Sequence, residues 1–369
     1  MWVESVRLRN FRNYFAEDVS FSPHINLIVG SNGEGKTNLL EALFLLATTK
    51  SYRLAHEKEM VCIDRDTFYV SGEAVLQGDI KHTLEISYSQ KQNKKQAKVS
   101  GIPVVRLADF IGILNVVCFS PDDLNIIKGA PGLRRRLLDI LLSQIDRVYL
   151  SVLQQYGRVL RQRNECLKAV QRGRMRPTEI WPWTEQLATL ACQVTERRFK
   201  AVNELTTSYA AISKGINQGK ENLSLRYMSS LIKDSHLYTP TEVTESLQRR
   251  QTEEVARGIT TIGPHRDDLF FLINGLSAAD YASQGQQRTA VLSLKLAEME
   301  YMYKVTGDYP ILLLDDVFSE LDQKRRQLLL TTLSGRIQAL ITGTETLEWP
   351  WSGERDRCNI INIRQGKVI

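Results

Sequence analysis

The sequence lacks the features that mark several specialised classes of protein. Its five cysteines are scattered without a C-x-x-C pair, so the pattern predicts neither a disulfide framework nor a zinc site. Apolar runs such as 311–314 are far too short to span a bilayer, and the N-terminal residues lack the apolar core of a signal peptide. We found no internal repeat or low-complexity segment. We therefore expect a cytoplasmic protein that does not cross a membrane.

The composition itself is ordinary for a globular chain with a sizeable core. Of the 369 residues, 43% are hydrophobic and 24% are charged, which is enough for one large domain with insertions or for two domains. The formal net charge is +6. A moderately basic chain is compatible with a nucleic-acid partner but does not establish one.

The segment from Ile25 to Leu45 reads as a short apolar strand, a glycine-rich turn and a helix. In this context its G-x-x-x-x-G-K-T pattern predicts a phosphate-binding loop. Glycines let successive N–H groups converge on a polyphosphate, and the helix N-terminus adds partial positive charge. We expect Lys36 to reach the phosphates of ATP and the Thr37 hydroxyl to bind Mg²⁺. The predicted nucleotide-binding residues in this segment are Gly30, Ser31, Asn32, Gly33, Glu34, Gly35, Lys36, Thr37 and Asn38.

Three strand-like segments, 67–76, 80–89 and 94–99, follow the loop and its helix, and residues 90–93 carry a hairpin signal. Lysines crowd that hairpin at positions 91, 94, 95 and 98. They are typical of an edge strand that is protected from pairing with other chains, and equally of a DNA contact. Both interpretations of Lys91, Lys94 and Lys95 remain open at this point.

The middle of the chain predicts a helical arm. Apolar residues recur at helical spacing over 133–170 and 183–212, and a breaker region with two prolines separates them, so we expect an antiparallel helical hairpin. Residues 134–176 carry eleven Lys or Arg against three acidic residues, a net +8. Because a solvated helix face usually mixes charges, this favours a polyanionic partner. We expect Arg161, Arg163, Arg172 and Arg174 to contact DNA.

A second set of motifs lies near the C-terminal end. Residues 311–314 form an apolar strand that ends in Asp315 and Asp316, a Walker B pattern in which the first aspartate holds Mg²⁺ and the second orients the attacking water. About thirty residues upstream, Ser283-Gln284-Gly285-Gln286 heads a helix, and a Ser–Gly turn at a helix N-terminus is a second anion cradle. The S-E-L-D segment 319–322 follows Walker B directly.

This combination resembles the ATP-binding-cassette ATPases of the SMC and Rad50 type, with a short helical arm in place of a long coiled coil. The stretches 8–14, 119–139, 260–269, 282–289 and 312–322 together resemble the RecF family of bacterial recombinational-repair proteins. The resemblance implies an α/β fold: an ABC-type P-loop ATPase head with a mixed sheet and helices, and an inserted helical lobe. We place the head at 1–123 and 258–369 and the lobe at 124–257.

The resemblance also implies a function. ATP would drive a head-to-tail homodimer in which the phosphate loop of one subunit faces the signature of the other. The dimer would bind DNA at single-strand/double-strand junctions or gaps and load recombinase with RecO and RecR. On this basis Arg12 and Asn13 would flank the nucleotide, and Ser283 and Gly285 would approach the γ-phosphate from the partner. Gln286 would also bind the nucleotide, and Lys36, Asp316 and Ser283 would be catalytic. Thr37 and Asp315 would hold Mg²⁺.

Three departures from the cassette pattern predict slow hydrolysis. Gln284 replaces a glycine of the transporter signature, Asp316 replaces the usual glutamate, and Thr342 occupies the position where many such ATPases use histidine. No Q-loop glutamine is evident, and residues 120–122 are candidates for that position. His265 has no co-ligands at metal spacing, so we expect it to pack structurally.

Two other functions compete with an ATP-gated DNA clamp. One is a nucleotide-binding scaffold that dimerises, hydrolyses negligibly and acts through protein partners. The other is a transporter ATPase subunit or a P-loop kinase. The signature helix and the basic arm argue against a kinase, and no segment suggests docking to a membrane partner.

Overall fold

The computed structural model describes residues 1–53, 56–333, 337–344 and 358–369. The chain divides into two compact units. Unit 1 comprises 1–124, 215–219 and 288–369, and unit 2 comprises 125–214 and 220–287. Within the described residues, no helix combines the length and apolarity that crossing a membrane requires.

Unit 1 contains two six-stranded sheets. The first is antiparallel, in the order β2-β1-β4-β5-β6-β7. The second has the order β17-β16-β3-β15-β14-β8, and its strands are parallel apart from β17. The strands are β1 (Trp2–Phe11), β2 (Tyr14–Ser20), β3 (Ile25–Val29), β4 (Thr67–Leu76), β5 (Ile80–Ser89), β6 (Lys94–Val99), β7 (Ile102–Pro103), β8 (Val116–Phe119), β14 (Ile311–Leu314), β15 (Ala339–Gly343), β16 (Cys358–Arg364) and β17 (Lys367–Val368).

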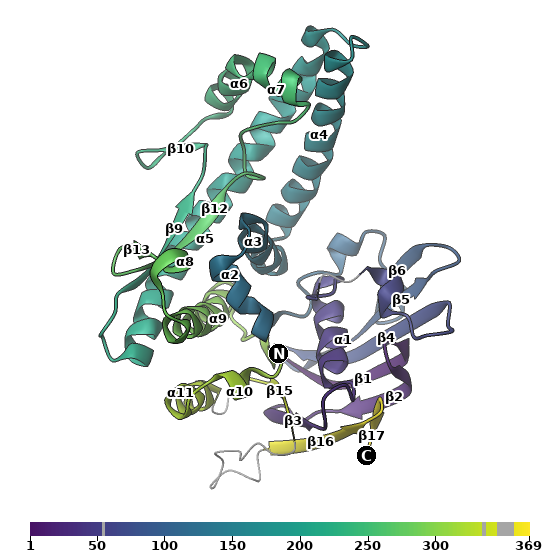
Figure 1. Ribbon diagram of the computed structural model, residues 1–369. Helices are drawn as coiled ribbons and strands as arrows, with labels where there is room; N and C mark the ends of the chain where they lie inside the picture. Colours follow the sequence, from purple (N-terminus) through teal and green to yellow (C-terminus); the bar gives the residue numbers. More distant parts are fainter. Residues whose placement is uncertain (54–55, 334–336, 345–357) are drawn as a thin grey trace. The chain divides into compact units, whose positions relative to one another are not determined.

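Helix α1 (Lys36–Thr48) contacts strands of both sheets (Figure 1). It is buried along nearly its whole length. Strands β3 and β14 are buried throughout, as their continuous apolar runs require in a parallel sheet. The remaining helical segments of unit 1 are the 3₁₀ turns η1 (Glu57–Met60), η2 (Leu107–Asp109) and η3 (Pro121–Leu124), and helices α10 (Val317–Glu320) and α11 (Gln323–Leu333). Helix α9 (Gln284–Thr306) belongs to unit 1 from residue 288.

Unit 2 is built on two long helices, α4 (Arg147–Gln171) and α5 (Trp181–Asn217), joined by a short turn (Figure 1). The predicted hairpin is therefore present. Its other elements are α2 (Asn125–Lys128), α3 (Pro131–Ile145), η4 (Pro177–Ile180), α6 (Pro240–Arg249), α7 (Gln251–Arg257), α8 (Ala278–Tyr281), β9 (Leu223–Met228), β10 (Ile232–Lys233), β11 (His236–Leu237), β12 (Asp268–Ile273) and β13 (Leu276–Ser277).

The single helix predicted over 133–170 is wrong, because the chain breaks at Asp146. This residue is extended (φ −132°, ψ 97°), and its Oδ1 accepts a hydrogen bond of 2.8 Å from the Tyr149 N–H. An aspartate in this position satisfies an otherwise unpaired N–H at the start of α4. The apolar period continues across the break, which is why periodicity alone did not reveal it.

Unit 2 also extends beyond the boundary predicted at residue 257. Strand β12 pairs antiparallel with β9, and β13 pairs with β12. These strands form one three-stranded sheet, so residues 258–287 group with the arm and not with the head. The signature residues 283–287, which we predicted to be part of the head, therefore belong to unit 2 together with this sheet.

Candidate nucleotide site and arm surface

The phosphate loop lies between β3 and α1, as predicted. Gly35 has φ +119°, and a Cβ there would lie 2.7 Å from the Asn13 amide nitrogen. At Gly30, a Cβ would lie 2.3 Å from the carbonyl oxygen of Ile363. Any side chain at these two positions would collide with neighbouring groups, so glycine is required for the loop to approach both segments.

Lys36 is held against the loop itself. Its Nζ donates to the carbonyl oxygens of Gly30 at 2.6 Å and Ser31 at 2.8 Å. Burial lowers the pKa of Lys36, and the nearby charges of Asp316 and Asp315 oppose that shift. The ammonium group therefore lies against the loop backbone, between the residues that we predict to bind phosphate.

Thr37 and Asp315 meet, although 278 residues separate them. The Thr37 hydroxyl donates to Asp315 Oδ1 at 2.9 Å. The Asp315 N–H donates to the Phe119 carbonyl at 2.9 Å, which fixes the end of β14 beside the end of β8. Hydroxyl and carboxylate oxygens are the hard ligands that Mg²⁺ takes, so these two residues fit the predicted ion.

Thr342 holds the backbone of the second aspartate. The Asp316 N–H donates to the Thr342 hydroxyl oxygen at 2.8 Å, and that hydroxyl lies 3.1 Å from Asp315 Oδ1. Asp316 itself has φ 52° at the start of α10. The position at which related ATPases use histidine therefore links the two aspartates of Walker B. The side chains of Ser319 and Glu320, in the S-E-L-D segment, lie outside those that the structure describes.

Arg12 and Asn13 lie beside the loop in different ways. Asn13 donates to the Glu34 carbonyl at 2.9 Å and accepts from Asn38 at 2.8 Å. The Arg12 guanidinium forms a bidentate pair with Glu41 at 2.8 and 2.7 Å. Asn13 therefore supports the loop directly, whereas Arg12 is anchored to α1.

Two residues of this site escaped the sequence analysis. The Tyr52 hydroxyl donates to Asp315 Oδ2 at 2.9 Å, and burial raises the pKa of this phenol. Glu41 is fully buried in α1 and also contacts the Ser51 hydroxyl. A single glutamate within an apolar helical run was the available signal for Glu41. Tyr52 lies in a polar stretch without periodicity and gave none.

The signature residues form a reciprocal cap at the start of α9. The Ser283 N–H donates to Gln286 Oε1 at 2.7 Å, and the Gln286 N–H donates to Ser283 Oγ at 3.3 Å. Gln286 also donates to Glu221 at 2.7 Å, whereas Ser283 and Gln284 are exposed. Ser120 of the candidate Q-loop is fixed by a 2.7 Å bond from its N–H to Asp123.

The DNA contact predicted at Arg163 is wrong. Arg163 is completely buried, pairs with Glu254 at 2.7 Å and donates to the Thr260 hydroxyl at 2.8 Å. It faces the interior of unit 2, because α4 turns its 156-159-163-167 face inward. Arg161, Arg172 and Arg174 are exposed, and within the described residues their side chains have no ion-pair partner.

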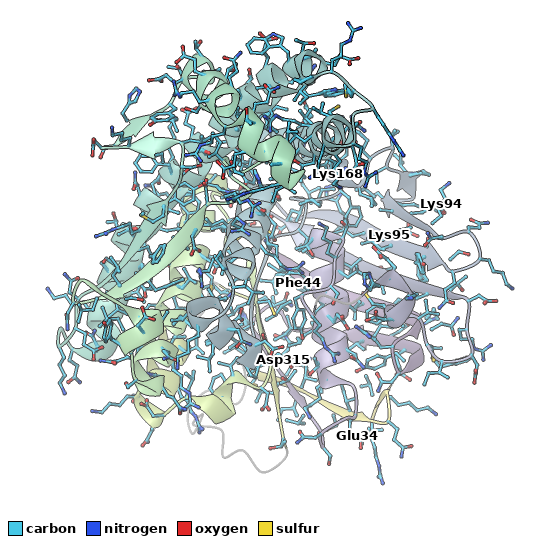
Figure 2. All side chains as sticks on the ribbon, turned by 45° about the horizontal axis from the view of Figure 1, so that its top comes forward. Glu34, Phe44, Lys94, Lys95, Lys168 and Asp315 are labelled. Atoms are coloured by element: carbon cyan, nitrogen blue, oxygen red, sulfur yellow. The ribbon has the colours of Figure 1, made fainter. Side chains whose placement is uncertain are left out.

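The hairpin lysines differ from one another. Lys95 donates to Glu57 and to the Thr49 carbonyl, each at 2.7 Å, and only 11% of its side chain is exposed. Lys91 pairs with Asp66 at 2.7 Å but remains largely exposed, and Lys94 is exposed (Figure 2). Lys95 is thus a structural residue of unit 1, which removes it from the predicted DNA surface.

His265 packs structurally, as expected. Its Nδ1 lies 2.5 Å from the Tyr156 hydroxyl, and its Nε2 lies 3.1 Å from the Thr260 carbonyl. Burial, together with Arg266 and Arg135, lowers the pKa of His265 to about 4. The ring is therefore neutral at pH 7, with Nε2–H donating to the carbonyl and Nδ1 accepting from the tyrosine.

Comparison with known proteins agrees with this geometry. The family described as "RecF/RecN/SMC N terminal domain" matches residues 2–347. The DNA replication and repair protein RecF of Listeria innocua is 41% identical over 349 residues, which is 94% of each chain. The protein of the same name from Staphylococcus aureus is 40% identical over 374 residues and covers 100% of both chains. The chain belongs to the RecF family.

Solved structures support the same assignment. A structure described as the recombination mediator protein RecF-ATP in the RecFOR pathway aligns with a TM-score of 0.92 and 33% identity, covering 100% of this chain and 97% of the other. An Smc head bound to a domain of ScpA aligns with a TM-score of 0.55 and 15% identity, which indicates a shared fold alone. The RecF family thus accounts for the ABC-type ATPase head and for its inserted helical arm.

Proposed function

We propose that this chain is an ATP-hydrolysing, DNA-binding protein of recombinational repair and replication restart, like the RecF relatives that it matches. The contact of the Thr37 hydroxyl with Asp315 at 2.9 Å carries this proposal, because it joins the phosphate loop to Walker B as a nucleotide site requires. Thr37 and Asp315 would hold Mg²⁺, which supplies charge neutralisation of the phosphates.

The protein's own groups divide the work at the nucleotide. Lys36 would exchange its two carbonyl partners for the β- and γ-phosphates, and the loop N–H groups would bind the remaining phosphate oxygens. Asp316, held by Thr342, would orient the attacking water and accept its proton. An aspartate is one methylene shorter than glutamate, so we propose that ATP turnover is slow. We propose separately that DNA stimulates it.

We propose that ATP drives a head-to-tail homodimer. Ser283 and Gln284 are exposed at the start of α9, where the signature of one subunit can face the phosphates bound by its partner. Ser283, Gly285 and Gln286 would supply this second anion cradle. The nucleotide then serves as the contact between subunits, and hydrolysis releases them.

We propose that DNA with a single-strand/double-strand junction or a gap binds the exposed face of α4 and its adjoining turn. Arg161, Arg172 and Arg174 present charge without base-reading chemistry, which suits phosphate contacts. By analogy with the relatives of the RecFOR pathway, RecR with RecO would be its protein partners in loading recombinase. Binding to DNA would keep the protein at the nucleoid.

Sedimentation of the Ser283→Arg variant tests this proposal. We expect wild-type protein to dimerise with ATP and Mg²⁺, and the variant to bind ATP with normal affinity but remain monomeric, because the added bulk and charge enter the partner's γ-phosphate position. An equimolar mixture with Lys36→Met should associate with ATP, since one composite site then keeps an intact loop and an intact signature. ATP-dependent dimerisation of Ser283→Arg alone would overturn the signature assignment.

A further inference from the structure

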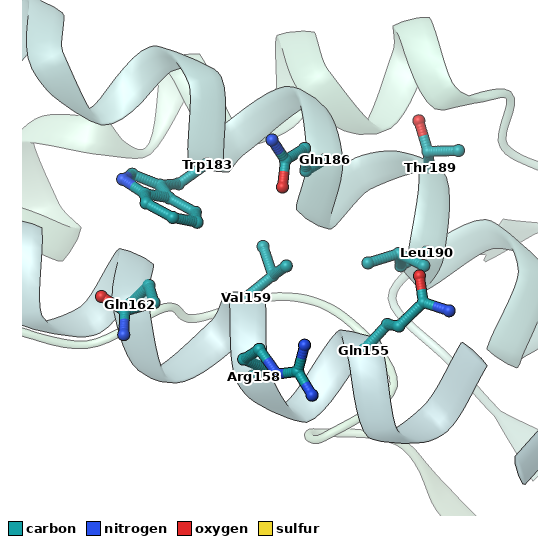
Figure 3. A pocket seen from close by; sticks show the side chains of 8 residues that line it. All are labelled: Gln155, Arg158, Val159, Gln162, Trp183, Gln186, Thr189 and Leu190. Atoms are coloured by element: carbon teal, nitrogen blue, oxygen red, sulfur yellow. The ribbon is translucent and has the colours of Figure 1, made fainter. Parts of the chain in front are cut away.

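A groove of about 530 Å³ lies between α4 and α5 within unit 2 (Figure 3). This volume is within the usual range for small-molecule sites. The residues that line it come from one stretch of each helix: Gln155, Arg158, Val159 and Gln162 from α4, and Trp183, Gln186, Thr189 and Leu190 from α5.

The lining combines one large aromatic ring with amide groups. The indole of Trp183 lies between the two helices near Val159, and both Trp183 and Leu190 are partly exposed (Figure 3). Within the described part of the chain, the amides of Gln162 and Gln186 have no hydrogen-bond partner. Each amide offers both a donor and an acceptor, and the indole offers a flat face for stacking.

The rim of the groove is positively charged. Arg158 lines it, and Arg161, Lys168 and Arg172 follow along α4 at spacings of three, seven and four residues, which place all four on one helix face. Lys168 pairs with Glu165 at 2.9 Å. Arg158, Arg161 and Arg172 are exposed. A nucleic-acid backbone that follows this face would bring its bases beside the groove.

We propose that this groove holds an unstacked base of single-stranded DNA, with the base stacked on Trp183 and its edge bonded by the glutamine amides. The inference rests on the proposed DNA-binding function and specifies the part of the substrate that this site recognises. Duplex DNA keeps its bases stacked and paired, so it can use the arginines but not the groove. Amides that both donate and accept suit any base, so the site would show little sequence preference.

The test measures the affinity of the full chain for a 20-nucleotide dT oligomer, for its abasic analogue of equal length and for a 20-base-pair duplex. We expect Trp183→Ala to weaken dT binding about 5- to 150-fold, the loss that one stacked base gives. Its affinity for the duplex and for the abasic strand should match wild type. Because indole carries no charge, the dependence of log K on log salt should not change in slope.

Two matched variants complete the design. Trp183→Phe keeps a stacking face and should retain most of the dT affinity. Trp181→Ala removes an aromatic ring that is 40% exposed at the start of the same helix but does not line the groove, and it should bind all three DNAs as wild type does. A dT oligomer containing 5-iodouracil should photocrosslink to Trp183, as mass spectrometry of the peptides would show.

The outcomes separate failure of this inference from failure of the proposed function. If wild type binds duplex with a steep salt dependence but Trp183→Ala leaves dT binding unchanged, the groove does not hold a base. Equal losses with dT, abasic strand and duplex would overturn the inference as well, because they would assign Trp183 to folding or to a backbone contact. Wild-type protein that binds none of the three DNAs would overturn the proposed DNA-binding function and this inference with it.

Discussion

The charged groups of the nucleotide site and those of the arm differ in how firmly the protein holds them. Lys36, Asp315 and Arg12 each have partners within 3 Å in unit 1. On α4 of unit 2, Arg161 is exposed while Arg163, two residues further on, is completely buried. A motif with fixed spacing specifies a residue together with its partners, whereas a run of charge specifies only composition. Roles can therefore be proposed residue by residue in the first region but only face by face in the second.

We expect the largest effect on ATP hydrolysis from Asp316→Asn, a substitution in the nucleotide site. The amide keeps the shape but cannot accept a proton, so ATP binding should persist while hydrolysis falls about 10²- to 10⁴-fold. Steady-state phosphate release and binding of a fluorescent ATP analogue would separate the two steps. Asp315→Asn is the matched control, since it should weaken nucleotide binding itself.

The same experiment distinguishes a clamp from a scaffold. DNA-stimulated hydrolysis in wild type that Asp316→Asn abolishes would support an ATP-gated clamp. Equal residual turnover in wild type and variant, with or without DNA, would favour a scaffold that binds nucleotide and acts through its partners.

Arg163→Ala should destabilise the protein by about 3–5 kcal/mol, because it leaves the Glu254 carboxylate buried without its cation. Arg161→Ala is the control on the same helix and should change stability by less than about 0.5 kcal/mol. It should instead reduce the slope of log K for DNA against log salt by about one. Denaturant unfolding and DNA titrations measure the two effects. Similar stability of the two variants would contradict the structural role of Arg163.

The smallest predicted effect concerns His265 and acid. Its folded-state pKa of about 4 lies below the ordinary 6.5, so the unfolded chain binds a proton first as pH falls through this window. The neutral ring therefore contributes stability above pH 6.5 that is lost progressively toward pH 4, about 2 kcal/mol of it by pH 5. His265→Gln keeps a donor and an acceptor but does not titrate, so its stability should fall less between pH 7 and pH 5.

The variant must be compared with wild type at each pH. Burial raises the pKa of Glu298 in unit 1 to about 7. As pH falls, protonation of Glu298 therefore adds stability over much of the range in which His265 removes it. Because Glu298 is present in both proteins, the difference in unfolding free energy isolates His265. Parallel pH profiles of wild type and variant would show that His265 titrates normally in the folded chain.

Local chemistry explains which parts of the fold were predictable. The strands at 67–76, 80–89 and 94–99 agree with the structure, because alternation and a four-residue turn define a hairpin without outside help. Each depends on residues close in sequence.

The errors share a different cause. The helix break at Asp146, the burial of Arg163 and the role of Tyr52 in contacting Asp315 each depend on partners that tertiary packing selects. Neither Pro nor Gly marks Asp146, and hydrophobic periodicity does not show which arginine of a basic helix turns inward. For the nucleotide site, the motif spacing supplied this long-range information, and the structure brings Thr37 of the loop and Asp315 of Walker B into contact.

The contacts between the phosphate loop and the last strands of the chain limit when the loop can be completed during translation. Strand β3 pairs on one side with β15 and on the other with β16, and the N–H groups of Gln365 and Gly366 donate to Glu34 of the loop. Gln365 follows Glu34 by 331 residues, so a ribosome adding about 5–20 residues per second needs about 15–65 s between them. Until β15 (Ala339–Gly343) has been made, the emerging β3 has no neighbour from its own sheet on either edge. The contacts of Gln365 and Gly366 with the loop can therefore form only after translation has passed residue 366, and for most of that time β3 exposes unpaired strand edges.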